Sequence, residues 1–194
     1  SQATVELLAA EARTAANQAD YATARSKAAE AIALQPDNLN LALLPVNFAA
    51  LEGDNEEALD ILEEVETTFG ESSAIVRARA QLLGRANRLE EAISVLETYY
   101  EKASDLSVLP DLINIALRTA SGKADTYTEE WLMKAPDNPA AHMSRAEYLL
   151  QKGNEIEAAS HYEQVLEQLP DNPMALNNLA WTLRERDRNR ALQM

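Results

Sequence analysis

The chain has 194 residues, of which 46% are apolar, 32 are acidic and 17 are basic, giving a net charge of −15. This charge argues against nucleic-acid binding, which needs basic residues to neutralise phosphates, and against anionic membrane surfaces. The absence of cysteine excludes disulfides and thiolate metal sites, and no apolar run of about 18 residues is present to span a membrane. Only five glycines and seven prolines, with abundant alanine and leucine, favour an all-α fold.

A repeat of about 34 residues runs along the sequence. The run Pro-Asp-Asn occurs at 36–38, 136–138 and 170–172. Small helix-forming residues recur in step with it, at Ala24, Ala58, Ala92, Ala124 and Ala158. Two further series keep the same interval, namely Ala31, Val65, Tyr99, Trp131 and Val165, and Ala12, Val46, Ala80, Asn114, Ala146 and Ala180. Each series contains one 32-residue step, which predicts that two residues are missing from the turn near Ser121 and Gly122.

Each repeat is predicted to form a helix A, a turn and a helix B. The repeats cover about residues 5–38, 39–72, 73–106, 107–138 and 139–172, with a partial sixth at 173–194. In the second repeat, Gly53 ends helix A, and Pro45 lies inside that helix, where it should kink or restart it. In the fourth, Asn114 replaces the small helix-A residue. In the fifth and sixth, Asp-Asn-Pro supplies an N-cap and a proline for the first helical turn.

These features resemble the tetratricopeptide repeat family. The fifth repeat matches its pattern best, through Ala146, Leu149, Gly153, Ala158, Tyr162, Val165 and Pro170. The resemblance implies one α-α superhelix (solenoid) over residues 1–194, right-handed and built from eleven helices in antiparallel pairs. It also implies that helix A lines a concave groove, that helix B forms the convex back, and that the protein is not an enzyme.

No sequence pattern indicates catalysis or a cofactor. His142 and His161 lie on different helices, with no second histidine at i+3 or i+4, so no metal site is expected. No glycine-rich phosphate loop or nucleophile elbow occurs. Trp131 falls in a packing series and should be buried. Trp181 follows Ala180 by one residue and should point about 100° away from the packing face.

Charge is distributed unevenly between the two kinds of helix. The helix-A segments contain nine basic and six acidic residues, which leaves eight basic and 26 acidic residues elsewhere. The resemblance therefore implies a near-neutral or slightly basic groove on an acidic body. Arginine suits a carboxylate, and asparagine can hold peptide backbone. The groove candidates for peptide binding are Arg13, Asn47, Arg77, Gln81, Arg118, Glu147, Asn177 and Trp181. The alternative is a solvated concave face without a ligand.

The expected function is a scaffold that binds a peptide or a partner protein in this groove. Residues 175–181, Ala-Leu-Asn-Asn-Leu-Ala-Trp, also resemble the closing repeats of bacterial envelope proteins, including lipoproteins of exosortase and exopolysaccharide export systems. The alternative function is therefore a docking component of such an assembly, in the cell envelope or periplasm rather than the cytoplasm. An enzyme or a sugar-binding module is a third hypothesis, for which Trp181 is the only candidate aromatic.

The end of the sequence leaves the sixth repeat without a second helix. The chain stops at Met194, so Leu176, Leu179, Ala180 and Leu183 have only residues 189–194 to cover them. We expect a missing helix, a partner or a homotypic contact between two copies to cover this stripe.

Overall fold

Helices make up the regular structure of the computed structural model, which describes residues 1–119 and 122–184. No strand occurs in these two ranges. Besides a 3₁₀ helix η1 at Leu106–Val108, the α-helices are α1 (Gln2–Asn17), α2 (Tyr21–Leu34), α3 (Leu39–Ala42), α4 (Leu44–Glu52), α5 (Asn55–Phe69), α6 (Ser73–Arg85), α7 (Leu89–Ala103), α8 (Leu109–Leu117), α9 (Lys123–Lys134), α10 (Pro139–Gln151), α11 (Glu155–Gln168) and α12 (Pro173–Leu183).

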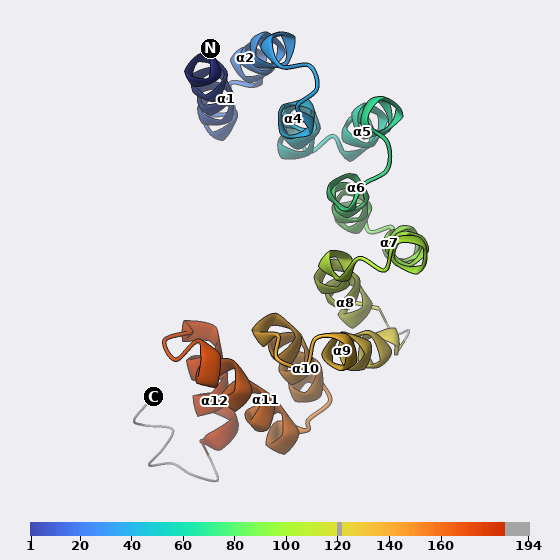
Figure 1. The fold of residues 1–194 in the computed structure, drawn as a ribbon, viewed down its shortest axis with the longest axis vertical. Helices are drawn as coiled ribbons and strands as arrows, with labels where there is room; N and C mark the ends of the chain where they lie inside the picture. The colour runs from blue at the N-terminus through green and yellow to red at the C-terminus, as the bar shows by residue number, and fades with distance from the viewer. Residues whose placement is uncertain (120–121, 185–194) are drawn as a thin grey trace. The chain divides into compact units, whose positions relative to one another are not determined.

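The residue contacts divide the chain into two compact units, an N-terminal unit of Ser1–Tyr99 and a C-terminal unit of Tyr100–Met194. In the N-terminal unit, α1 packs on α2, and α5 packs on both α4 and α6. In the C-terminal unit, each helix from α8 to α12 packs on the next one along the chain (Figure 1). Each unit is thus a stack of helix pairs, and the all-α solenoid class is confirmed. The continuous array over all 194 residues stays a prediction.

Pro45 divides the helix A of the second repeat into two helices. α3 ends at Ala42, and α4 begins at Leu44 with the proline in its first turn, where a missing N–H costs nothing. The predicted restart is therefore confirmed. It also explains why the described residues contain twelve α-helices where eleven were expected.

The turns between helix A and helix B share one backbone conformation in four repeats. One residue in each turn has a positive φ: Ala19 (60°), Gly53 (94°), Asn87 (59°) and Gly153 (78°). In three of these turns, the side chain of the next residue accepts a hydrogen bond from a backbone N–H three positions on. These N-caps are Asp20, Asp54 and Asn154.

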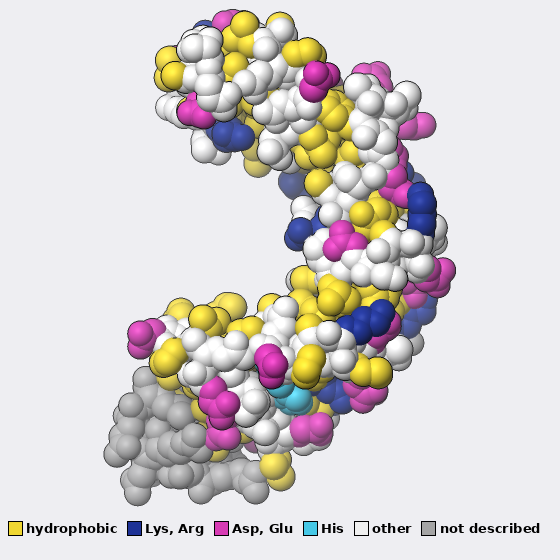
Figure 2. Space-filling view, viewed as in Figure 1, with side chains coloured by type: hydrophobic (Ala, Val, Ile, Leu, Met, Phe, Trp, Pro, Cys, Tyr) yellow, Lys and Arg dark blue, Asp and Glu magenta, His cyan; other side chains and the backbone are white. Residues whose placement is uncertain are grey.

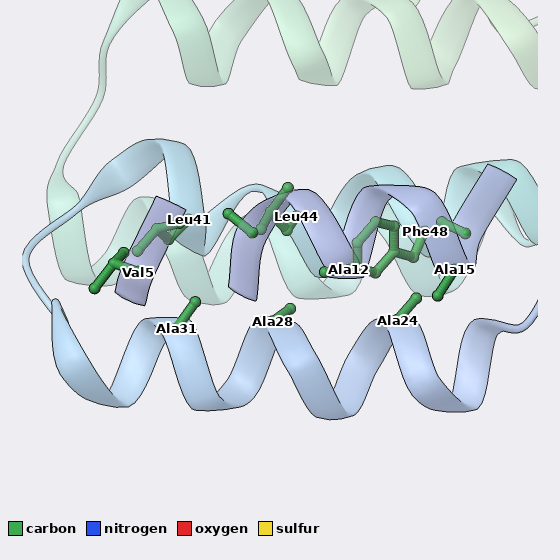
Figure 3. Close-up of a cluster of buried hydrophobic side chains, with 11 residues drawn as sticks. Val5, Ala12, Ala15, Ala24, Ala28, Ala31, Leu41, Leu44 and Phe48 are labelled. Atoms are coloured by element: carbon green, nitrogen blue, oxygen red, sulfur yellow. The ribbon is translucent and has the colours of Figure 1, made fainter. Parts of the chain in front are cut away.

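Small side chains fill the contact between the paired helices. All five alanines of the first predicted series are buried. Between α1 and α2, the alanines of both helices face one another, and Leu41, Leu44 and Phe48 close the cluster from α3 and α4 (Figure 3). Alanine at these positions lets the two backbones approach to about 8–9 Å.

The inward face of α8 differs from the prediction. Asn114 was placed at the small packing position, but its side chain is exposed, whereas Leu112 is fully buried. The helix is therefore two residues out of phase with the expected repeat. The 32-residue step therefore lies before α8 and not in the turn after it. A helix buries its apolar stripe whatever the length of the loops on either side, so the buried Leu112 marks the packing position of this repeat.

Candidate interaction site

The predicted groove residues of the N-terminal unit all lie on helices A. Arg13 is on α1, Asn47 on α4, and Arg77 and Gln81 on α6. Arg13, Asn47 and Gln81 are exposed, and Arg77 is half-buried. Their placement in a concave groove stays a prediction.

The predicted residues of the C-terminal unit cluster mainly on α10 and α12. Glu147 is exposed on α10, and Asn177 and Trp181 are exposed one turn apart on α12. Met174 lies one turn before Asn177 and is also exposed, so α12 presents a continuous face of mixed apolar and amide character. Arg118 is the C-terminal cap of α8 and is exposed. We call Glu147, Met174, Asn177 and Trp181 the α12 face.

Trp181 is the most prominent side chain of the α12 face. It is 56% exposed, as its offset from Ala180 predicted, whereas Trp131 is buried, also as predicted. The guanidinium of Arg184 lies 4.0 Å from the centroid of the indole ring and donates a hydrogen bond to the Trp181 carbonyl oxygen (2.7 Å). Arg184 is in turn 3.5 Å from Glu155 of α11. The ring is thus held in place while much of its surface remains open, as recognition of a partner requires.

A buried hydroxyl lies next to this face. Tyr162 of α11 is fully buried, and its Oη has no hydrogen-bond partner of good geometry among the residues that the structure describes. Burial first, and then the charge of Glu147, raises the pKa of the Tyr162 phenol to about 12, while the nearby amide of Asn178 lowers it. Burial also raises the pKa of the Glu147 carboxyl, although part of that side chain reaches solvent. The phenol therefore stays protonated at neutral pH and can act as a donor.

Two helix-A arginines that are not among the groove candidates form ion pairs with the preceding helix B. Arg145 of α10 is buried and binds Asp125 (2.5 Å), Thr128 (3.0 Å) and Glu129 (3.1 Å), all on α9. In the third repeat, Arg79 is paired with Glu66 of α5. Arg79 and Arg145 are 66 residues apart, which is one 34-residue step plus the 32-residue step, so they occupy the same repeat position. The repeat spacing in the sequence shows that these two arginines are equivalent, whereas a count of charges does not.

The two histidines meet across the α10–α11 pair. The Nδ1 atoms of His142 and His161 are 2.9 Å apart, and the Nε2 of His142 is 2.7 Å from the Pro136 carbonyl oxygen. Because a carbonyl only accepts, Nε2–H of His142 donates to it, and Nδ1–H of His161 then donates to His142. Burial, His142 and the charge of Arg145 lower the pKa of His161. Sequence spacing missed this pair because the two residues lie on different helices, 19 residues apart, and meet only through the packing of α10 on α11.

No group of three or more metal-binding side chains occurs within residues 1–119 and 122–184. No helix in those ranges is both long enough and apolar enough to cross a membrane. The α12 face offers the aromatic ring of Trp181, the amide of Asn177 and the carboxyl of Glu147, a chemistry that suits peptide groups.

Two tetratricopeptide repeat models match the sequence, over residues 117–173 and 161–193. The predicted resemblance is therefore confirmed for residues 117–193. No curated protein matches the sequence at a significant level.

Solved structures extend the likeness to the whole chain. PilF from Pseudomonas aeruginosa has a TM-score of 0.69 at 14% identity, covering 99% of this chain and 89% of its own. PilW, described as a widely conserved type IV pilus biogenesis factor, has a TM-score of 0.70 at 15% identity, covering 97% and 89%. YrrB, described as a tetratricopeptide repeat protein with an unusual peptide-binding site, has a TM-score of 0.55 at 17% identity, covering 86% and 87%. At these identities the likeness shows the fold.

Proposed function

We propose that this chain is a protein-interaction scaffold whose α12 face binds a peptide segment of a partner. The observation that carries the proposal is Trp181, a large aromatic that remains 56% exposed although Arg184 fixes it in position. Tryptophan, tyrosine and arginine are enriched among the residues that dominate the binding energy of protein interfaces.

The polar side chains of Asn177 on α12 and Glu147 on α10 support a peptide rather than another ligand. Asn177 can both donate to and accept from a peptide group, and Glu147 can accept a backbone N–H or pair with a basic side chain. Tetratricopeptide repeat proteins generally act as scaffolds and not as enzymes, and YrrB is described as binding a peptide. The helix-A residues Arg13, Asn47, Arg77, Gln81 and Arg118 are proposed as further contacts for the same class of ligand.

The experiment begins by selecting binders from a random peptide display library against the purified protein. Binding of a selected peptide is then measured by calorimetry and by the change in tryptophan fluorescence. Trp181→Ala should weaken binding by about 30-fold or more, as expected for an aromatic hot spot. Met133→Ala is the matched control, because Met133 is 78% exposed on α9, away from the α12 face. Wild-type affinity in both Trp181→Ala and Asn177→Ala would refute the proposed face.

A docking component of a bacterial envelope assembly is the second candidate function. It is favoured by the fold likeness to PilW, a type IV pilus biogenesis factor, and by the residues 175–181 that resemble envelope repeat proteins. Exopolysaccharide export is one such assembly. Fractionation of the source cells, followed by cross-linking of the envelope fraction, tests this function. Recovery of the protein only from the cytoplasm would contradict it.

A further inference from the structure

A groove lies between α5 and α7 in the N-terminal unit, over α6. It has a volume of about 410 Å³, within the range of about 300–1,000 Å³ that is usual for binding pockets. None of its lining residues belongs to the proposed peptide-binding set. We call it the α5–α7 groove, and it is lined by Glu56, Leu59, Asp60, Glu63, Glu66, Arg79, Leu83, Arg88, Glu91 and Val95.

The groove combines an apolar floor with an acidic rim. Leu83 is buried and Leu59 and Val95 are half-buried, so together they form the floor. The lining also contains five carboxylates and two guanidinium groups, a net charge of −3. Acidic and basic side chains gather over α5 and α7 in Figure 2. The apolar floor distinguishes this groove from a merely solvated row of acids.

The two arginines join the walls of the groove. Arg88 holds Glu91 with two hydrogen bonds of 2.8 Å and reaches Glu56 of α5 at 3.4 Å. Arg79 is paired with Glu66, which ties α6 to α5. These pairs neutralise the carboxylates at the ends of the rim and hold the flanking helices together.

Asp60 and Glu63 are the two lining carboxylates that neither Arg79 nor Arg88 neutralises. Both are exposed on α5, and neither forms an ion pair within residues 1–119 and 122–184. They are three residues apart on one helix, so their side chains are neighbours about 5–6 Å apart, and their like charges repel. A cation placed between them would remove this repulsion.

We propose that the α5–α7 groove binds a cationic segment of a partner protein. Lysine or arginine side chains of the segment would pair with Asp60 and Glu63, and an apolar side chain between them would pack on Leu59 and Val95. The apolar floor selects a peptide segment over a metal ion, which gains nothing from contact with leucine and valine. Charge complementarity with an acidic rim would also speed association.

The test uses a labelled 15-residue helical peptide of leucine and lysine, with leucines on one face, and fluorescence anisotropy at 50 mM salt. The double variant Asp60→Asn/Glu63→Gln should weaken binding by about 2- to 30-fold, since each exposed ion pair contributes roughly 0.2–1 kcal/mol. The control Glu64→Gln/Glu90→Gln removes two charges from exposed positions of α5 and α7 outside the groove and should change binding less than twofold. Equal losses in the two double variants would overturn the proposal.

The apolar floor has its own test. Val95→Thr keeps the side-chain shape but adds a hydroxyl, and it should weaken the leucine–lysine peptide while leaving a serine–lysine peptide of the same charge unaffected. Binding of the serine–lysine peptide or of spermine as tightly as the leucine–lysine peptide would refute a peptide-specific groove. Trp181→Ala should leave binding to the α5–α7 groove unchanged, so failure here is separable from failure of the proposed function.

Discussion

Replacing Ala58 by leucine tests the packing that holds each helix pair together. Ala58 lies on α5, is fully buried and belongs to a core cluster with Ala49, Leu62 and Val65. Leucine adds three carbon atoms at a point with no open space, so α4 and α5 must separate or adopt strained rotamers. Overpacking of this kind costs about 1–3 kcal/mol in the free energy of unfolding. In a unit of this size, each 1 kcal/mol lowers the Tm by about 4–8 °C.

The assay is urea and thermal unfolding of the purified variants followed by circular dichroism. Ala29→Leu is the control, because Ala29 is exposed on α2 and the same change there should alter stability by less than about 0.5 kcal/mol. The two compact units can unfold in separate steps, so the midpoints of both transitions must be compared. Equal effects of the two substitutions would refute the assigned packing face, and so would a more stable Ala58→Leu protein.

Three further predictions concern local features. Ala19→Gly should stabilise the N-terminal unit by up to about 1 kcal/mol in urea unfolding, because glycine adopts φ 60° without the clash of a Cβ, and a lower midpoint would contradict this. Arg145→Ala should lower the free energy of unfolding by about 1–3 kcal/mol in the same assay. The loss is smaller than for a fully buried ion pair because Asp125 and Glu129 stay partly solvated, and an unchanged midpoint would refute the packing role of Arg145. The pKa of His161 is lowered in the folded protein, so its contribution to the free energy of unfolding is fully present above the unfolded-state pKa near 6.5. That contribution is lost as the pH falls towards the folded-state pKa. Between pH 7.5 and pH 5.5, thermal melts should show a smaller fall in Tm for His161→Gln than for the wild-type protein, and equal falls would refute the prediction.

The sequence predicts the helix pairs well because the repeat marks both partners of each contact. The alanine series identifies the residues at which two helices touch, and all five of its members are buried. The turn residues Gly53 and Gly153 have the expected positive φ, and Pro45 restarts a helix as predicted. These features depend on local conformation and on periodicity, both of which are visible in a single sequence.

The same reasoning is less successful where a contact depends on how two helices are aligned. Leu112 is buried in place of Asn114, two residues earlier, because the loop before α8 is the shorter one. The sequence shows that one loop is shorter but not which one. His142 and His161 meet only because the turn between α10 and α11 sets their register. Trp181 is exposed, as its offset from Ala180 predicted, whereas the burial of the Tyr162 hydroxyl depends on three-dimensional packing. The peptide-binding role of the α12 face stays a prediction.

The arginine pairings also change what the charge contrast between the two kinds of helix means. Arg79, Arg145 and Arg184 are basic residues of helices A, yet each pairs with an acid on the preceding helix B. Part of the apparent basicity of the groove is therefore internal to the stack, and recognition at the α12 face must rest mainly on aromatic packing and amide hydrogen bonds. The uncompensated acids of α5 place charge selection in the α5–α7 groove instead. Because salt screens exposed ion pairs but barely affects packing, raising ionic strength should weaken binding to the groove far more than binding to the α12 face.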